Sequence, residues 1–164
     1  RARRNEPQEY RPRLVRGINL LITNEYEYTN THVNTSMIKR NDLVYPELSY
    51  AILGILFDVW NTIGSGHKEI IYQRATAHHF RTKELQIIEQ APADIVYKGK
   101  IIGKYYFDFL INNQIVVELK VRNYFSKKDI EQVYGYLKSK NLKLGLLVHF
   151  TDSGVKYKRV INSI

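Results

Sequence analysis

The middle of the chain constrains its fold most strongly, because two strand-like segments follow each other there with almost nothing between them. Residues 101–111 and 115–121 are rich in β-branched and aromatic side chains, which favour strands. The two asparagines between the segments are typical of a turn. The sequence therefore predicts a hairpin of neighbouring strands. Charged residues interrupt the apolar pattern of residues 107–121 at three positions: Asp108, Glu118 and Lys120.

Two helices are expected before the hairpin. Pro46 suits the first turn of a helix, and apolar residues recur at helical spacing from there to Ile63. A second helix is predicted over residues 67–83. Its inner face is expected to consist of Ile70, Ile71, Ala75 and Phe80.

Further strands and a third helix complete the pattern. Strands are predicted over residues 85–90 and 94–97, and again over 142–150. Ser126 followed three residues later by Asp129 forms a capping box that opens the third helix. The residues after Gly154 are expected to form a short basic tail. This order predicts an α/β (α+β) fold in which helices flank a central mixed sheet.

The register of the hairpin decides whether its charged residues meet. Residues two apart in a strand share a face, so Glu118 and Lys120 point the same way. A three-residue loop would place Asp108 opposite Glu118, whereas a two-residue loop would place Asp108 opposite Val117 and on the other face. The turn residues alone do not choose between these loops.

A carboxylate pair on a sheet would be costly without a cation, because the two charges repel. Mg²⁺ prefers carboxylate oxygens completed by waters and substrate phosphates, and a bound ion can acidify a water ligand. A lysine on the same face can offset the charge that develops on a phosphate. Such a set suits phosphodiester hydrolysis. The alternative is an ordinary carboxylate–lysine pair on the surface of an edge strand.

Composition points to a polyanionic partner. The chain has 25 Lys and Arg against 16 Asp and Glu, a net charge of +9, which favours nucleic acid or simply a solvated basic surface. It has no cysteine, which excludes disulfides, thiolate metal sites and a cysteine nucleophile. The longest apolar run, residues 51–60, is broken by Asp58 and is too short to span a membrane. Without a recognisable export segment, we expect a cytoplasmic protein.

The first 36 residues differ from the rest of the chain. They are rich in polar residues and tyrosine and show little apolar periodicity, although residues 14–23 could form a strand. One interpretation takes Met37 as the natural start, so that residues 1–36 are foreign or weakly ordered. The other takes them as an N-terminal arm that pairs with the core or with a partner. Residues 37–164 are expected to form one domain.

The hairpin motif, Asp108 followed by Glu118-Leu119-Lys120, resembles the PD-(D/E)XK nuclease superfamily. Upstream, residues 66–72 match the signature of its GxxExxY family. The resemblance covers residues 37–164, with Phe107 where the motif's name has proline. Three further stretches agree in order: residues 72–75, 96–99 and 143–147.

The resemblance implies a restriction-endonuclease-like core and specific roles for the matching residues. Asp108 and Glu118 are implied as catalytic carboxylates that bind the metal, with Lys120 as the catalytic lysine. Glu69 and the carbonyl of Leu119 are implied as further metal ligands. For Glu69 the alternative is that the dipole of its helix favours a carboxylate in the first turn.

The third helix is expected to contact the substrate. Gln132 and Tyr136 lie four apart on one helix face and resemble the QxxxY element of RecB-like nucleases, which orients the lysine or touches the DNA backbone. They could instead form an ordinary polar helix edge. Lys127 and Lys128 are expected to steer a phosphate backbone toward the metal, unless they serve only solubility.

The sequence therefore predicts a nuclease that requires Mg²⁺ (or Mn²⁺) and hydrolyses phosphodiester bonds, with DNA as the expected substrate. The alternative is a catalytically silent module that keeps the nuclease fold and binds nucleic acid or another partner. The sequence does not distinguish single from double strands, DNA from RNA, or exonuclease from endonuclease action, and it gives no oligomeric state.

Overall fold

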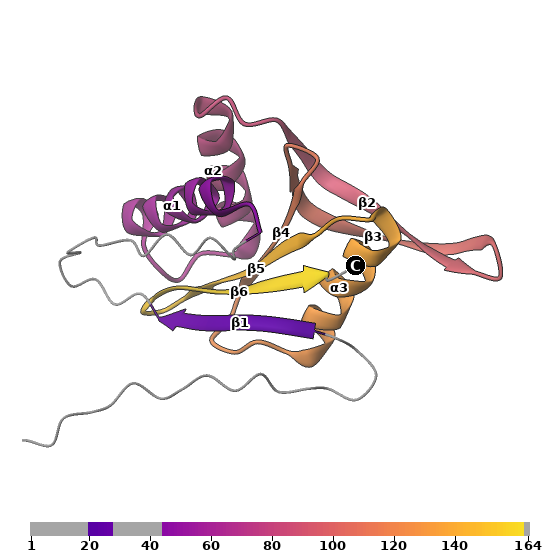
Figure 1. Cartoon of the computed structure of the whole chain (residues 1–164). Coiled ribbons are helices and arrows are strands. Elements are labelled where there is room, and N and C mark those ends of the chain that lie inside the picture. The colour runs from indigo at the N-terminus through magenta and orange to yellow at the C-terminus, as the bar shows by residue number, and fades with distance from the viewer. Residues whose placement is uncertain (1–19, 28–43, 163–164) are drawn as a thin grey trace, which may run out of the picture.

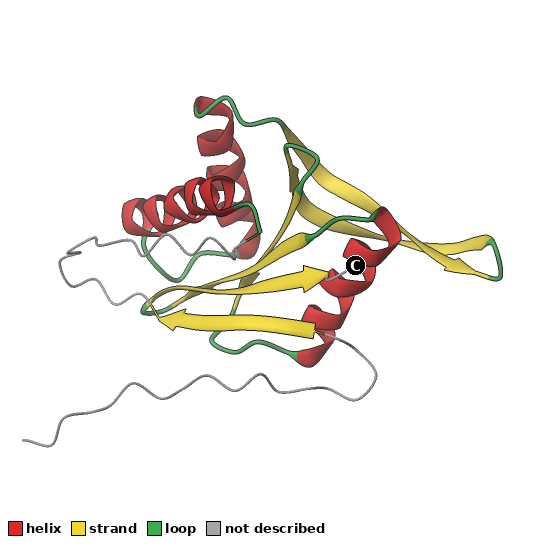
Figure 2. Cartoon of the chain, in the orientation of Figure 1, coloured by secondary structure: helices red, strands yellow, loops and turns green. Residues whose placement is uncertain are grey.

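A computed structural model describes residues 20–27 and 44–162, the former as backbone only. Figures 1 and 2 show the helices and strands of this part of the chain. In chain order the elements are β1 (Leu20–Glu27), α1 (Pro46–Ile63), α2 (Glu69–Thr82), β2 (Ile87–Tyr97), β3 (Lys100–Ile111), β4 (Ile115–Val121), α3 (Lys127–Lys140), β5 (Leu144–Thr151) and β6 (Gly154–Asn162).

The strands form one mixed sheet in the order β1-β6-β5-β4-β3-β2. Only β4 and β5 run parallel among these neighbours, and the other pairs are antiparallel. A parallel pair needs a crossover connection, and α3 supplies it. Figure 2 shows α1 and α2 on one side of the sheet and α3 on the other. The predicted α/β fold with a flanked central mixed sheet is therefore confirmed.

The core lies in two layers, one on each face of the sheet. The larger layer packs α1 and α2 against side chains such as Phe109, Val117 and Leu119. The smaller layer packs α3 against side chains that include Phe107 and Val116. Most of these side chains have no exposed surface, and each buried aliphatic or aromatic side chain contributes about 1.5–3 kcal/mol.

The helix ends follow the local chemistry of the sequence. Pro46 occupies the first turn of α1, and Gly64 ends that helix with φ 75°, a conformation that glycine adopts without strain. The backbone N–H of Asp129 donates to the Ser126 hydroxyl at 3.1 Å, so the predicted cap of α3 is present.

The predicted inner face of α2 was wrong in part. Ile70 and Ile71 are 45% and 39% exposed, whereas the buried side chains of α2 are Tyr72, Thr76, Ala77 and Phe80. Residues 72, 76 and 80 are spaced at i, i+4, i+8 and form one helical row. The hydroxyl of Tyr72 donates to the Gly64 carbonyl at 2.7 Å, which turns Ile70 and Ile71 toward solvent.

The predicted strands also need correction. The two strands predicted over residues 85–90 and 94–97 are replaced by a single strand, β2, which begins at Ile87 and runs without a break to Tyr97. The expected basic tail after Gly154 is a strand, β6. It lies between β5 and β1, and its Arg159 donates to the Ser49 hydroxyl at 2.7 Å and the Val44 carbonyl at 2.5 Å. These contacts attach β6 to the start of α1.

Part of the N-terminal segment pairs with the sheet. Strand β1 runs antiparallel to β6, with Leu20 opposite Asn162 and Glu27 opposite Lys156. This strand overlaps the one expected over residues 14–23. Met37 and the rest of residues 1–36 lie outside the described residues, so the proposed division of the chain at residue 36 stays a prediction.

Strand β3 pairs with two partners over different lengths. It pairs with β2 along nearly its whole length, but with β4 only from Phe109 to Ile111. We call the part of this hairpin that extends beyond the sheet the hairpin arm (residues 92–106), which is drawn projecting from the body in Figure 1. Asp108 therefore lies where β3 leaves β4.

Candidate active site

The register of β3 and β4 brings Asp108 and Glu118 face to face. Ile111 pairs with Ile115 and Phe109 with Val117, which is the register of a three-residue loop. The backbone N–H of Asp108 donates to a Glu118 carboxylate oxygen at 3.4 Å. The odd-length loop that the catalytic interpretation required is present.

Lys120 joins this pair from the same strand. Its Nζ lies 2.6 Å from Glu118 Oε1 and 3.7 Å from Glu69 Oε1. Glu118 is 7% exposed, and residues two apart in a strand share a face. The ammonium group therefore lies between a carboxylate of the sheet and a carboxylate of α2.

The first two turns of α2 close the cluster from the other side. Gln73 Nε2 donates to Asp108 Oδ1 at 2.7 Å and to Glu69 Oε1 at 3.4 Å. Sequence reasoning missed Gln73. The signal was present, since Gln73 follows Glu69 by four residues and so shares its helix face.

Burial and mutual repulsion keep a proton on the cluster near neutral pH. Burial, and then the neighbouring Glu118 charge, raise the pKa of Asp108 to about 7, against the lowering effect of the Leu119 N–H. Burial also raises the pKa of Glu118, although Lys120 opposes this. Burial lowers the pKa of Lys120, but Glu118 and Glu69 outweigh it and the net pKa is raised. Lys120 is therefore firmly charged.

The backbone of Leu119 faces the same place. Its N–H donates to Asp108 Oδ2 at 2.7 Å. The N–H and C=O of one strand residue point to the same side of the strand, so the Leu119 carbonyl faces the side on which Asp108 lies.

The donor set fits a hard divalent cation. Two carboxylates, a backbone carbonyl and waters are ligands that Mg²⁺ prefers, and a cation would remove the repulsion that raises the pKa of Asp108. Among the described residues, no three His, Asp or Glu side chains already form an arrangement that could hold a metal ion. The reason is visible in the contacts: Lys120 holds Glu118 and Glu69, while Gln73 and the Leu119 N–H hold Asp108.

The residues predicted to bind substrate lie along α3. Gln132, Tyr136 and Lys128 line a groove between α3 and the hairpin arm. Tyr136 is 5% exposed, and its ring lies 4.6 Å from that of Phe107, the neighbour of Asp108. Lys127 does not line the groove and pairs with Glu131 at 3.3 Å. No described hydrogen bond or ion pair joins these four residues to the carboxylate cluster.

A second residue that sequence reasoning missed lies beside Lys120. His149 on β5 pairs in register with Lys120, is fully buried, and stacks on Phe125 with ring centroids 3.9 Å apart. Neither ring nitrogen has a hydrogen-bond partner among the described residues. Burial, and then the Arg122 charge, lower the pKa of His149 to about 4, so this imidazole is neutral. Nothing in the sequence distinguishes it from other strand residues.

None of the helices among the described residues combines the length and apolar character needed to cross a membrane. No curated protein matches the chain. A crystal structure of an alkaline exonuclease (LHK-Exo) from Laribacter hongkongensis is similar in part, with 11% identity, a TM-score of 0.44, and coverage of 70% of this chain and 69% of that one.

The family comparison covers most of the chain. Residues 46–160 match the model of the PD-(D/E)XK nuclease superfamily, a range that runs from the start of α1 into β6 and contains Asp108, Glu118 and Lys120. Membership of the narrower GxxExxY family stays a prediction. The chain belongs to the PD-(D/E)XK nuclease superfamily.

Proposed function

We propose that this protein is a Mg²⁺-dependent nuclease that hydrolyses phosphodiester bonds of DNA. One observation carries the proposal: Asp108 and Glu118 lie opposite each other at the place where β3 leaves β4, with Lys120 on the same face 2.6 Å from Glu118. A buried carboxylate pair destabilises a fold unless a cation offsets it.

Asp108, Glu118 and the Leu119 carbonyl would hold the ion, and Glu69 on α2 would provide a further carboxylate ligand. A divalent ion bound there polarises a phosphodiester and acidifies a water ligand. To serve as a ligand, Asp108 must release the proton that its pKa of about 7 retains. Gln73 supports the ionised form, because a hydrogen bond to the charged carboxylate favours it.

Lys120 would act on the phosphate rather than on the ion. Its ammonium is held by Glu118 and Glu69, and it is therefore positioned in advance to offset negative charge on the phosphate oxygens in the transition state. If Glu118 held the ion, Lys120 would lose its nearest partner and its ammonium group would be available to the substrate.

The surrounding charge supports a polyanionic substrate. The chain carries a net charge of +9, and basic surfaces bind phosphate backbones with little dependence on sequence. Lys127 and Lys128 open α3 and would contact the backbone from outside the cluster, while Gln132 and Tyr136 would do so along the groove.

The test is cleavage of single- and double-stranded DNA, with RNA alongside, in Mg²⁺ or Mn²⁺ under single-turnover conditions. We expect cleavage by the wild type and none above background by Asp108→Ala. Asp58→Ala is the matched control, since Asp58 is an exposed carboxylate on α1 that pairs with His79. If all three proteins cleave equally, a contaminating nuclease is responsible and the proposal fails.

One observation favours the silent module as the second candidate. Lys120 already neutralises Glu118 at 2.6 Å, so the cluster can persist without any ion. A purified wild type that binds DNA in either ion but never cleaves it would establish that alternative.

A further inference from the structure

The groove between α3 and the hairpin arm has the dimensions and lining of a nucleotide site. Its volume is about 430 Å³, within the range of about 300–1,000 Å³ typical of small-molecule sites. One wall is the arm, with Ala93, Ile95 and Tyr105, and the other is α3. The wall from α3 consists of Lys128, Glu131, Gln132, Gly135, Tyr136 and Ser139.

The exposed surface of this groove combines an aromatic ring with a free cation. Tyr105 is 45% exposed although it lines the groove. The two acids in the lining are already paired, Asp94 with Lys104 at 3.8 Å and Glu131 with Lys127 at 3.3 Å. In the described part of the chain, no carboxylate pairs with Lys128 in this way.

The groove and the carboxylate cluster adjoin the same stretch of β3. The cluster contacts α2 through Gln73 and Glu69, whereas the groove lies between α3 and the hairpin arm. The ring of Tyr136 in the groove wall lies 4.6 Å from that of Phe107, the neighbour of Asp108. Tyr105 precedes Asp108 by three strand residues, or about 10 Å at the usual strand rise. A nucleic-acid chain seated in the groove therefore lies beside the strand that carries Asp108.

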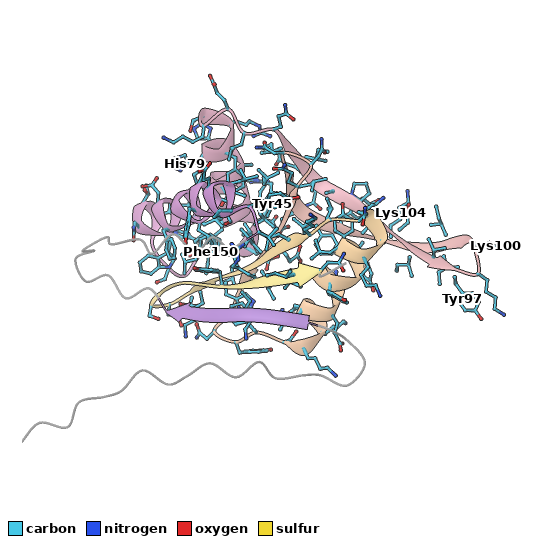
Figure 3. The ribbon with its side chains drawn as sticks, in the orientation of Figure 1. Tyr45, His79, Tyr97, Lys100, Lys104 and Phe150 are labelled. Atoms are coloured by element: carbon cyan, nitrogen blue, oxygen red, sulfur yellow. The ribbon has the colours of Figure 1, made fainter. Side chains whose placement is uncertain are left out.

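The rest of the arm carries basic residues suited to a phosphate backbone. Residues 92–106 contain Lys98, Lys100 and Lys104 against one acid, Asp94. Figure 3 shows Tyr97 and Lys100 at the tip of the arm, away from the body of the protein, and Lys104 near the base of the arm. An aromatic platform beside a basic track is how proteins bind unpaired strands.

We propose that the groove holds a single-stranded segment of the nucleic acid, with one base stacked on Tyr105 and a neighbouring phosphate on Lys128. This inference rests on the proposed function, since it specifies the form of the same substrate. An unpaired strand is required because the bases of a duplex are already stacked and paired, and their faces are not available to a side chain.

The test compares binding of a ~12-nucleotide DNA single strand with binding of the duplex of the same sequence, by fluorescence anisotropy in EDTA. The wild type should bind the single strand more tightly than the duplex. Tyr105→Ala should weaken single-strand binding about ten-fold, as removal of one stacking ring does, and Tyr105→Phe should retain it. Lys128→Ala should reduce the slope of log affinity against log salt by about 0.7.

Tyr106→Ala is the matched control. Tyr106 is the next residue of the same strand, is 55% exposed, and points to the opposite face, so its loss should leave single-strand binding unchanged. Melting temperatures of all variants verify that they fold. Equal losses for Tyr105→Ala and Tyr106→Ala, or a duplex bound as tightly as the single strand, would overturn the inference. Because binding in EDTA requires no cleavage, this result is independent of the activity assay.

Discussion

Replacing Asp108 with asparagine should make the protein more stable at alkaline pH without metal, even though it removes a proposed metal ligand. Burial and the Glu118 charge raise the pKa of Asp108 from 3.8 to about 7 in the folded protein. Between these values the folded state holds a proton that the unfolded state releases. The contribution of Asp108 to stability is therefore greatest at low pH and is lost as pH rises through this window.

The size of this effect follows from the two pKa values. The difference between about 7 and 3.8 corresponds to about 4 kcal/mol at 1.36 kcal/mol for each pKa unit. Asparagine resembles the protonated acid and never ionises, and its carbonyl can still accept from the Leu119 N–H that now lies 2.7 Å from Asp108. Allowing for imperfect replacement of the Gln73 contact, we expect a gain of about 2–4 kcal/mol above pH 7.

Urea unfolding in EDTA at about pH 4.5 and about pH 8 measures this gain. The gain in free energy of unfolding of Asp108→Asn over the wild type should be several-fold larger at the higher pH than at the lower pH. Asp58→Asn, at an exposed position, should change the free energy of unfolding little at either pH. The reasoning is refuted if Asp108→Asn is less stable than the wild type at the higher pH, or if its gain is the same at both.

Further outcomes follow from the charged and titratable groups in and around this cluster. Mg²⁺ should raise the melting temperature of the wild type by mass action and that of Asp108→Asn much less, as differential scanning fluorimetry would record. Lys120→Ala should slow single-turnover cleavage by ~100-fold or more with little loss of DNA affinity, while alanines at Lys127 and Lys128 should weaken binding and flatten its salt dependence. His149, with a pKa lowered to about 4, makes the folded state lose stability as pH falls from about 6.5 toward 4, so His149→Phe should reduce that acid loss in urea titrations.

Much of the fold was predictable because local chemistry and tertiary packing agree. The bounds of β4 are those the apolar run predicts, and α1 and α3 begin where Pro46 and the Ser126 cap place them. Strand β6 was missed because Lys156, Lys158 and Arg159 interrupt its apolar pattern. The residues that hold it in place are distant in the sequence: β6 pairs with β5 and β1, and Arg159 is buried against Ser49.

The sequence identified the main residues of the site but not how they are arranged in space. The motif names Asp108, Glu118 and Lys120, but the turn residues are compatible with loops of two or three residues, and one residue more or less moves Asp108 to the other face. Gln73 was overlooked because its partner Asp108 lies 35 residues away. The ring nitrogens of His149 have no hydrogen-bond partner among the described residues, and its stacking on Phe125 comes from a residue 24 positions away that no motif links to it.

The pairing of β1 with β6 has a consequence for solubility. Without β1, the outer N–H and C=O groups of β6 would be unpaired, and such a row is a template for strands of other molecules. A variant that begins at Met37 should therefore dimerise or aggregate as its concentration rises, which light scattering would detect, while the full chain stays dispersed. Restoring the dispersed state by adding a peptide of residues 20–27 would show that the N-terminal strand guards against misassembly.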